Sequence, residues 1–155
     1  MPGAPTTHAG VRQALAAVLE GHAVTAGTLR EAPTVYDQLN RADGVPDGRV
    51  HLAFAVGILS TSIPIVQRQT QGRDLLVSSR IGVRVLHRLR RSDEVADLDS
   101  ALTTEGEVVS RLLSQARGAG VSLAYSGTPR RVRVPDPESV LLELTFDSTY
   151  TIATS

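Results

Sequence analysis

The chain contains no cysteine, no tryptophan and no lysine, and it lacks any long apolar run. Without cysteine no disulfide can form, and the usual cysteine-containing structural zinc sites are excluded. No apolar stretch approaches the ~20 residues of a membrane-spanning helix. The first ten residues, MPGAPTTHAG, have neither a basic start nor an apolar stretch, so we expect no secretory leader. The default expectation is therefore a cytosolic protein with no membrane partner.

The charged residues balance: sixteen arginines face sixteen acidic residues. A formal net charge of zero argues against general affinity for nucleic acid. Aromatic residues make up only 3% of the chain, which leaves few side chains on which bases could stack. Arginine offers a rigid, bidentate and weakly hydrated group that suits protein interfaces and phosphates. A genome that favours arginine codons nevertheless explains the bias more simply than selection for function.

The length of 155 residues suits a single domain, 1–155, whose first seven residues we expect to be flexible. Residues 8–20, HAGVRQALAAVLE, place apolar side chains at helical spacing between a threonine cap and a following glycine. A second helix over 92–115 is predicted from Ser92 as its cap and from an apolar stripe. That stripe consists of Val95, Leu98, Ala101, Leu102, Val109, Leu112 and Leu113.

Alternation of apolar and polar residues predicts the strands. Short turns between consecutive strands imply antiparallel pairing. The fold class is therefore α+β, a mainly antiparallel sheet covered by two helices in the order α-β-β-α-β-β-β. In the first strand the residues that alternate with the apolar set are His51, Ala53, Ala55 and Gly57. Because this second set is small, a further element can pack on that face too. The predicted strands are 49–59, 73–90, 121–125, 130–134 and 140–152.

Two stretches interrupt this pattern. Residues 21–48 are mixed, with one or two helical turns predicted from Pro33 and a turn cluster at 41–48. Residues 60–72, STSIPIVQRQTQG, predict a projecting loop or hairpin arm, because Pro64 argues against a central strand. Loops of this length in a compact domain are usually functional or disordered.

Motifs of catalysis are missing from the sequence. It has no GxxxxGK[ST], GxGxxG, HExxH or GxSxG pattern. Its four histidines are far apart and lack ligand spacing, and His87 falls in line with apolar neighbours, which is typical of a satisfied core or interface residue. Asp147, Ser148 and Tyr150 suggest a hydrolytic site only weakly, since no base accompanies them. We expect no enzyme, no cofactor and no metal.

The most distinctive stretch is RIGVRVLHRLRR at 80–91, where an apolar set alternates with Arg80, Arg84, Arg88 and Arg90. From 68 to 91 seven arginines face a single acid. Three interpretations stay open. The following acidic helix lies near the strand and offsets its charge, or the strip is a plain solvated face. Alternatively, oppositely charged faces of two subunits meet head to tail and close a ring.

The acidic helix carries Asp97 and Asp99 two residues apart, so they point to different sides and do not form a metal pair. No basic residue occurs from 92 to 110. A solvated outer face is the favoured interpretation. The functional alternative is a contact surface for an arginine-rich neighbour.

The order of these segments resembles the phage tail terminator proteins, also called tail completion proteins. The resemblance rests on an N-terminal helix of the type VRQALAAVLEGH, followed by a strand and a long arm. It continues with LLVSSRIGVRVLHRLRR running into SDEVADLDSALTTEGEVVSRLL, and with the closing LLELTFDSTYTI. It covers residues 8–152 and concerns pattern and order, without an invariant signature.

The resemblance implies a structural virion protein at the tail–neck junction, assembled in the host cytoplasm. Members of this family are α+β subunits that form hexameric rings and are not enzymes. The ring caps the tail tube, ends its elongation and offers a joining surface to the head–tail connector protein. The implied partners are thus further copies of the chain, the tail tube protein and the connector, and DNA passes through the lumen without sequence-specific binding.

The resemblance also suggests where contacts form. The arm reaches a neighbouring subunit or the tube, and the strand 73–90 extends the sheet across a subunit boundary by edge pairing. Tail lumens are expected to be acidic because DNA must slide, so at least part of the arginine strip should contact a neighbour. The predicted interface residues are Pro64, Gln67, Arg68, Gln69, Arg73, Arg80, Arg84, Arg88, Arg90, Asp97 and Asp99.

Other functions stay open beside this one. The nearest is another neck component, a head–tail connector or stopper, which would share the ring. A small ligand-binding or enzymatic α+β domain is a second alternative, and a deep polar pocket within one subunit would favour it. A nucleic-acid-binding module is a third, and tight, salt-sensitive DNA binding by the monomer would support it.

Overall fold

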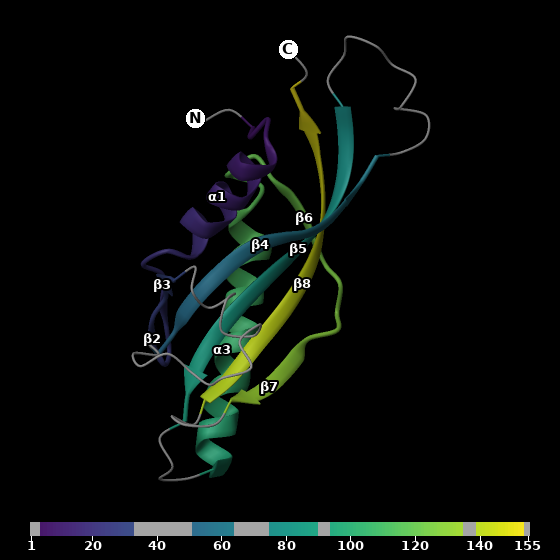
Figure 1. Cartoon of the computed structure of the whole chain (residues 1–155). Coiled ribbons are helices and arrows are strands. Elements are labelled where there is room, and N and C mark those ends of the chain that lie inside the picture. The colour runs from purple at the N-terminus through teal and green to yellow at the C-terminus, as the bar shows by residue number, and fades with distance from the viewer. Residues whose placement is uncertain (1–3, 33–50, 64–74, 90–93, 135–138, 154–155) are drawn as a thin grey trace.

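The computed structural model describes residues 4–32, 51–63, 75–89, 94–134 and 139–153. It is a mixed α+β fold with two helices and a mostly antiparallel sheet (Figure 1). The helices are α1 (His8–Leu19) and α3 (Glu94–Gln115). The strands are β1 (Ala23–Val24), β2 (Gly27–Thr28), β3 (Arg30–Glu31), β4 (Ala53–Ser62), β5 (Leu75–Arg88), β6 (Ser122–Tyr125), β7 (Arg130–Val134) and β8 (Ser139–Ile152).

Helix α1 begins and ends where its sequence predicts. The Thr7 hydroxyl accepts a hydrogen bond from the Gly10 N–H at 2.9 Å and so satisfies one of the free donors of the first turn. Val11, Leu15 and Leu19 form the buried face. The chain then turns at Gly21, whose φ of 73° suits glycine.

The main sheet has the order β3-β4-β5-β8-β6, and β7 pairs with β8 as well. All pairs are antiparallel except β3 with β4. Strand β5 lies between β4 and β8, and β8 pairs with it from Leu75↔Ile152 to Arg88↔Ser139. Over Ser78–Val85, where β4 pairs on its other side, this long strand therefore offers no edge, contrary to the prediction that it extends the sheet across a subunit boundary.

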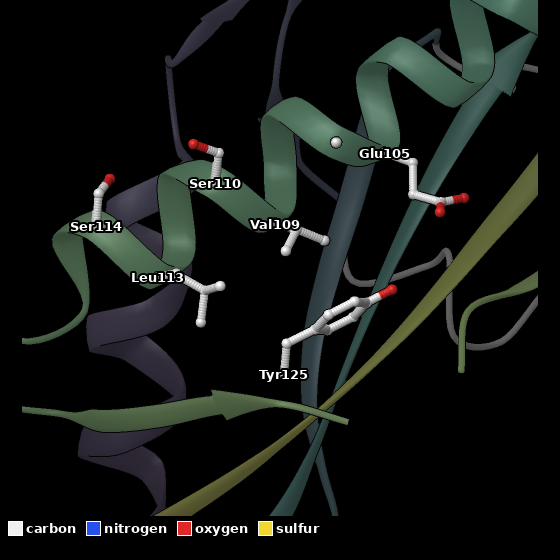
Figure 2. Close-up of a pocket in the computed structure, with 7 residues that line it drawn as sticks. Glu105, Val109, Ser110, Leu113, Ser114 and Tyr125 are labelled. Atoms are coloured by element: carbon white, nitrogen blue, oxygen red, sulfur yellow. The ribbon is translucent and has the colours of Figure 1, made fainter. Parts of the chain in front are cut away.

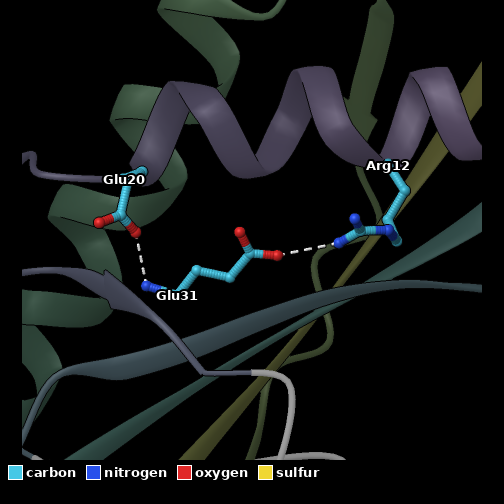
Figure 3. Close-up of polar contacts among 3 residues, drawn as sticks. All are labelled: Arg12, Glu20 and Glu31. Carbon is cyan, nitrogen blue, oxygen red and sulfur yellow. Dashed lines mark hydrogen bonds and ion pairs between the residues drawn. The ribbon is translucent and has the colours of Figure 1, made fainter.

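Three two-residue strands before β4 were not predicted. Strands β1 and β2 form a separate hairpin, while β3 adds to β4 in parallel. Side chains of α1 and of its C-cap Glu20 hold β3 in place (Figure 3): the Glu31 N–H donates to Glu20 Oε2 at 2.6 Å, and Arg12 Nη1 donates to Glu31 Oε1 at 3.0 Å. The helical turns expected after Pro33 and the turn cluster at 41–48 lie outside the described residues.

The two faces of the sheet are covered differently. Both helices lie on one face, above the main core. On the opposite face a smaller apolar cluster is buried beside the start of β4, and it consists of Ala53, Ala55, Leu86 and Leu141. The small side chains of β4 do therefore pack on a second face, as predicted. The central residues of the main core are Phe54, Val56, Ile81, Val83, Val85, Leu142, Leu144 and Phe146 from the sheet, with Val11, Leu15, Val108 and Leu112 from the helices.

Strands β4 and β5 continue past this core, and in Figure 1 their joined end points away from α3. The ladder register shifts between Ile58 and Ser60, so Leu59 is an extra residue in β4. Leu59 lies on Gly82, where an added Cβ would approach its Cδ1 to 3.0 Å. Residues 60–62 of the predicted arm belong to β4, and the part from Pro64 onward lies outside the described residues.

Candidate assembly surfaces

The arginines of β5 lie on the sheet face away from the helices, as the alternation predicts. Arg80 lies opposite Asp147 with 3.8 Å between Nε and Oδ1, and Arg84 lies opposite Glu143 with 3.5 Å between Nε and Oε1. The first pair is exposed, with 59% and 56% of the side chains accessible, whereas the second is largely covered, at 23% and 18%. Two arginines of the strip, Arg80 and Arg84, are therefore ion-paired across the sheet.

The neutralising carboxylates come from β8 and not from the acidic helix. Helix α3 lies on the other face of the sheet, so its acids do not offset the strip. Arg130 of β7 also approaches Glu143, at 3.8 Å. On β5, β7 and β8 this face carries four guanidinium groups and two carboxylates, an excess of positive charge. Its arginines are Arg80, Arg84, Arg88 and Arg130, and its acids are Glu143 and Asp147.

The first half of α3 carries an exposed apolar ridge, which we call the α3 ridge and define as Val95, Leu98 and Leu102. These side chains are 69%, 49% and 38% exposed. They belong to the stripe predicted from the sequence, but the apolar residues of α3 that are buried are Ala101, Val108 and Leu112, followed by Ala116 just after the helix ends. Asp99 is exposed beside the ridge and Asp97 half-buried. The ridge is thus an apolar surface in an acidic setting.

The second half of α3 borders an open groove of about 660 Å³ beside β6 (Figure 2). Val109 and Leu113 point from the helix toward Tyr125 of β6, and Ser110 and Ser114 of the same helix also line the groove. Leu113 is 44% exposed. Burial raises the pKa of the Tyr125 phenol, the nearby negative charge of Glu105 raises it further, and Arg131 opposes the shift. The groove has an apolar floor and one polar end.

A bidentate ion pair closes that polar end. Arg131 Nε and Nη2 donate to the two carboxylate oxygens of Glu105, each at 2.8 Å. The hydrogen bond to Glu105 is the main cause that raises the pKa of Arg131. Glu105 is buried, so the pair fixes β7 against α3. No sequence pattern connects two residues 26 positions apart, and sequence reasoning missed this contact.

His87 and His51 make contacts within the fold. His87 is buried, as predicted, and its Nε2 lies 3.2 Å from Ser100 Oγ of α3. His51 meets it edge to face, with 4.8 Å between ring centroids, although the two were expected to be far apart. The Arg88 N–H donates to His51 Nδ1 at 3.0 Å, which leaves His51 Nε2 to donate to the Ala26 carbonyl at 3.3 Å.

A chain of polar contacts joins α1 to the projecting strands. His8 Nδ1 lies 2.6 Å from the Tyr150 hydroxyl, which lies 2.8 Å from Ser79 Oγ. Ser79 Oγ in turn lies 3.0 Å from Thr61 Oγ1. Four elements, α1, β8, β5 and β4, are thereby linked on the helix-covered face. Ser79 and Tyr150 are buried, so the chain acts as a tie within the fold.

The sheet places the three residues of the weak hydrolytic candidate, Asp147, Ser148 and Tyr150, on different faces. Successive residues of β8 point to opposite faces, so Asp147 meets Arg80 on the outer face while Ser148 and Tyr150 lie on the helix-covered face. Ser148 Oγ donates to the Ser122 carbonyl at 2.6 Å. The three side chains do not converge on one site.

Within the described ranges no group of three or more metal-ligating side chains is placed to hold an ion. No helix in the part of the chain that the structure describes is long and apolar enough to cross a membrane. Of the predicted interface residues, Pro64, Gln67, Arg68, Gln69, Arg73 and Arg90 lie outside the described residues. The described ones fall on two separate surfaces: Arg80, Arg84 and Arg88 on the outer sheet face, and Asp97 and Asp99 on α3.

No protein-family model matches the chain, and no curated protein matches it.

Proposed function

We propose that this chain is a structural virion subunit that assembles head to tail with copies of itself into a ring. In this proposal the ring caps the tail tube, ends tail elongation and provides the head-joining surface, as in the tail terminator proteins that the sequence resembles. The observation that carries the proposal is the exposed α3 ridge on one layer of the fold, with a positively charged sheet face on the opposite layer.

Each of the two surfaces exposes groups that a partner could cover. Val95, Leu98 and Leu102 leave apolar area in water, and a clustered apolar surface of this kind is typical of an interaction site. Asp99 beside the ridge favours a cationic partner. The outer sheet face has that charge, and it also carries the exposed Leu59. Because the two surfaces differ and lie on opposite layers, each copy can use both in a head-to-tail contact, which generates a ring when the rotation between copies closes.

The finer features of the resemblance belong to the same proposal. The ends of β4 and β5 continue past the core, and in this proposal the segment between them, with Pro64, Gln67, Arg68, Gln69 and Arg73, would reach a neighbouring subunit or the tail tube. The proposed site of action is the tail–neck junction of the virion after assembly in the host cytoplasm. The role is mechanical, so it requires neither catalysis nor a cofactor.

The test is the mass of the purified protein in solution, alone and mixed with tail tube protein, followed by imaging of the particles. We expect a six-membered ring, or a cap at one end of each tube. Leu98→Asp should abolish the ring by placing a charge on the α3 ridge. Thr103→Asp is the matched control, since it adds the same charge to an exposed position of α3 beside the ridge, and it should still assemble.

Two outcomes would count against the proposal. A monomer that ignores tubes contradicts it outright and directs attention to the α3–β6 groove as a ligand site. A ring that binds heads but does not stay on tails that were assembled without heads would assign the chain to the connector or stopper role. A terminator remains on such tails.

A further inference from the structure

Gly106 lies in the middle of α3, where the fold itself does not require a glycine. A glycine inside a helix is less favourable than alanine, because it loses more backbone freedom on folding. A Cβ added at Gly106 would point into open space, with no atom from elsewhere in the described residues within 4 Å. The backbone of Gly106 does not adopt a positive φ either. Neither crowding nor backbone conformation within the described part of the chain explains this residue.

Gly106 interrupts a line of apolar side chains on α3. Leu102 comes four residues before it and Val109 three residues after it, so all three positions share one side of the helix. Leu102 is exposed and Val109 is half-buried. The missing side chain leaves a gap between them, which we call the Gly106 notch. The notch opens into the α3–β6 groove, since Gly106 and Val109 both line that groove.

Leu59 is a second unusual residue, and it lies over Gly82 on the outer sheet face. A Cβ added at Gly82 would approach the Leu59 atoms Cδ1, Cδ2 and Cγ to 3.0, 3.0 and 3.1 Å. A glycine inside a strand weakens it and often marks a close approach of this kind. The bulge in β4 and the glycine in β5 together hold a leucine that is still 52% exposed. Leu59 is therefore an apolar knob on the outer face.

The charges around the knob and around the notch are opposite in sign. Arg80 and Arg84 lie on either side of Leu59, because they precede and follow Gly82 by two residues on the same face of β5. On the helix, Asp99 comes seven residues before the notch, which is about two turns, so it lies on the same side of α3. No basic residue precedes the notch on α3. A knob with a cationic rim thus matches a notch in acidic surroundings.

We infer that Leu59 of one copy inserts into the Gly106 notch of the next copy. This inference rests on the proposed function and names the contact at the centre of its head-to-tail interface. The occupant is a second copy because the chain carries both the knob and the notch, with complementary charges around them. The sheet separates α3 from the outer face, so a subunit cannot fill its own notch. A leucine packed between the side chains of a facing helix excludes water, and the arginines beside it meet the acids of that helix.

Gly106→Ala tests the notch through two effects of opposite sign. The alanine favours the helix and its Cβ has open space, so the melting temperature of the monomer should rise by about 2–4 °C. The same methyl group occupies the notch and should weaken the contact between subunits about tenfold, measured by sedimentation. Thr103→Ala is the matched control. It also favours the helix, at an exposed position of α3, but adds no volume, so it should assemble like the wild type.

The chain has no cysteine, so the contact can also be captured as a disulfide. The double variant Leu59→Cys/Gly106→Cys is assembled with tail tube protein and oxidised. The smaller side chain at 59 makes room for the one added at 106, and we expect a ladder of linked subunits that ends at the ring. Leu76→Cys/Gly106→Cys is the control. Leu76 is also an exposed leucine on the outer face of β5, but it lies about 20 Å along the strand from Gly82 and should not link.

The outcomes separate this inference from the proposed function. A wild-type ring whose double variant forms no disulfide between 59 and 106 overturns the contact and leaves the ring standing as a proposal. Gly106→Ala assembling as well as the wild type has the same meaning. A disulfide between two 106 positions overturns the contact in favour of a two-fold interface. A chain that stays monomeric, alone and with tubes, overturns the proposed function and this inference with it.

Discussion

The two faces of the β5–β8 ladder share one backbone and are built on different principles. On the helix-covered face Ile81, Val83 and Phe146 are fully buried under α1 and α3. On the outer face the same strands present Arg80 and Arg84 to the carboxylates of β8. The helix-covered face is stabilised by the burial of apolar side chains. The outer face is stabilised by ion pairs that remain partly hydrated. Most of the buried apolar core therefore lies on the first face, whereas the second face combines a small apolar cluster with the ion pairs.

The largest expected effect comes from breaking the covered face. Phe146→Ala removes a fully buried ring, which costs about 3–5 kcal/mol of the free energy of unfolding through lost burial and the cavity left behind. Thr145→Ala is the matched control on the outer face and should stay within about 0.5 kcal/mol. Urea unfolding of both variants measures the difference. Equal losses would mean that the two faces contribute alike and that the comparison is wrong.

A smaller effect distinguishes the two ion pairs of the outer face. Double-mutant cycles should give a coupling of about 1 kcal/mol for Arg84–Glu143, whose side chains are mostly covered, and less than about 0.5 kcal/mol for Arg80–Asp147. The Arg80–Asp147 coupling should disappear in 1 M salt, because exposed pairs are screened. Since Arg130 also contacts Glu143, the first cycle is measured in an Arg130→Ala background. A stronger coupling for the exposed pair would contradict the burial argument.

The sequence predicted the composition of each face but not the partners on it. Strict alternation was enough to place Arg80 and Arg84 on one face of the sheet and Ile81 and Val83 on the other, because successive side chains along a strand point to opposite faces. Which carboxylates neutralise them depends on the register with β8, about sixty residues later, and a slip of one residue would exchange every contact. The acidic helix α3 is closer in sequence and was a plausible partner for the arginines of β5, but it lies on the other face of the sheet.

Helix α3 illustrates a second limit. Its apolar stripe predicted a helix correctly, yet the stripe is wider than the surface that the sheet covers, so Leu98 and Leu102 remain exposed while Leu112 is buried. Periodicity measures how many apolar residues a helix presents and says nothing about how far its neighbours extend. Strand β3 and its companions β1 and β2 were missed for a related reason, since two residues are too few to show alternation.

The smallest effect lies where the covered face opens to solvent, at Tyr125. Its pKa is raised above the ordinary 10.0, so the unfolded chain loses this proton at a lower pH than the folded one. The folded state therefore binds more protons in that range, and the free energy of unfolding falls as the pH rises above 10.0. Tyr125→Phe should remove this part of the decline, measured as urea unfolding on both sides of that pH.

Glu105→Gln should shift the phenolate absorbance of Tyr125 to lower pH, because it removes a negative charge that disfavours ionisation. A decline that persists unchanged in Tyr125→Phe would show that this edge of the covered face is as open to water as the outer face.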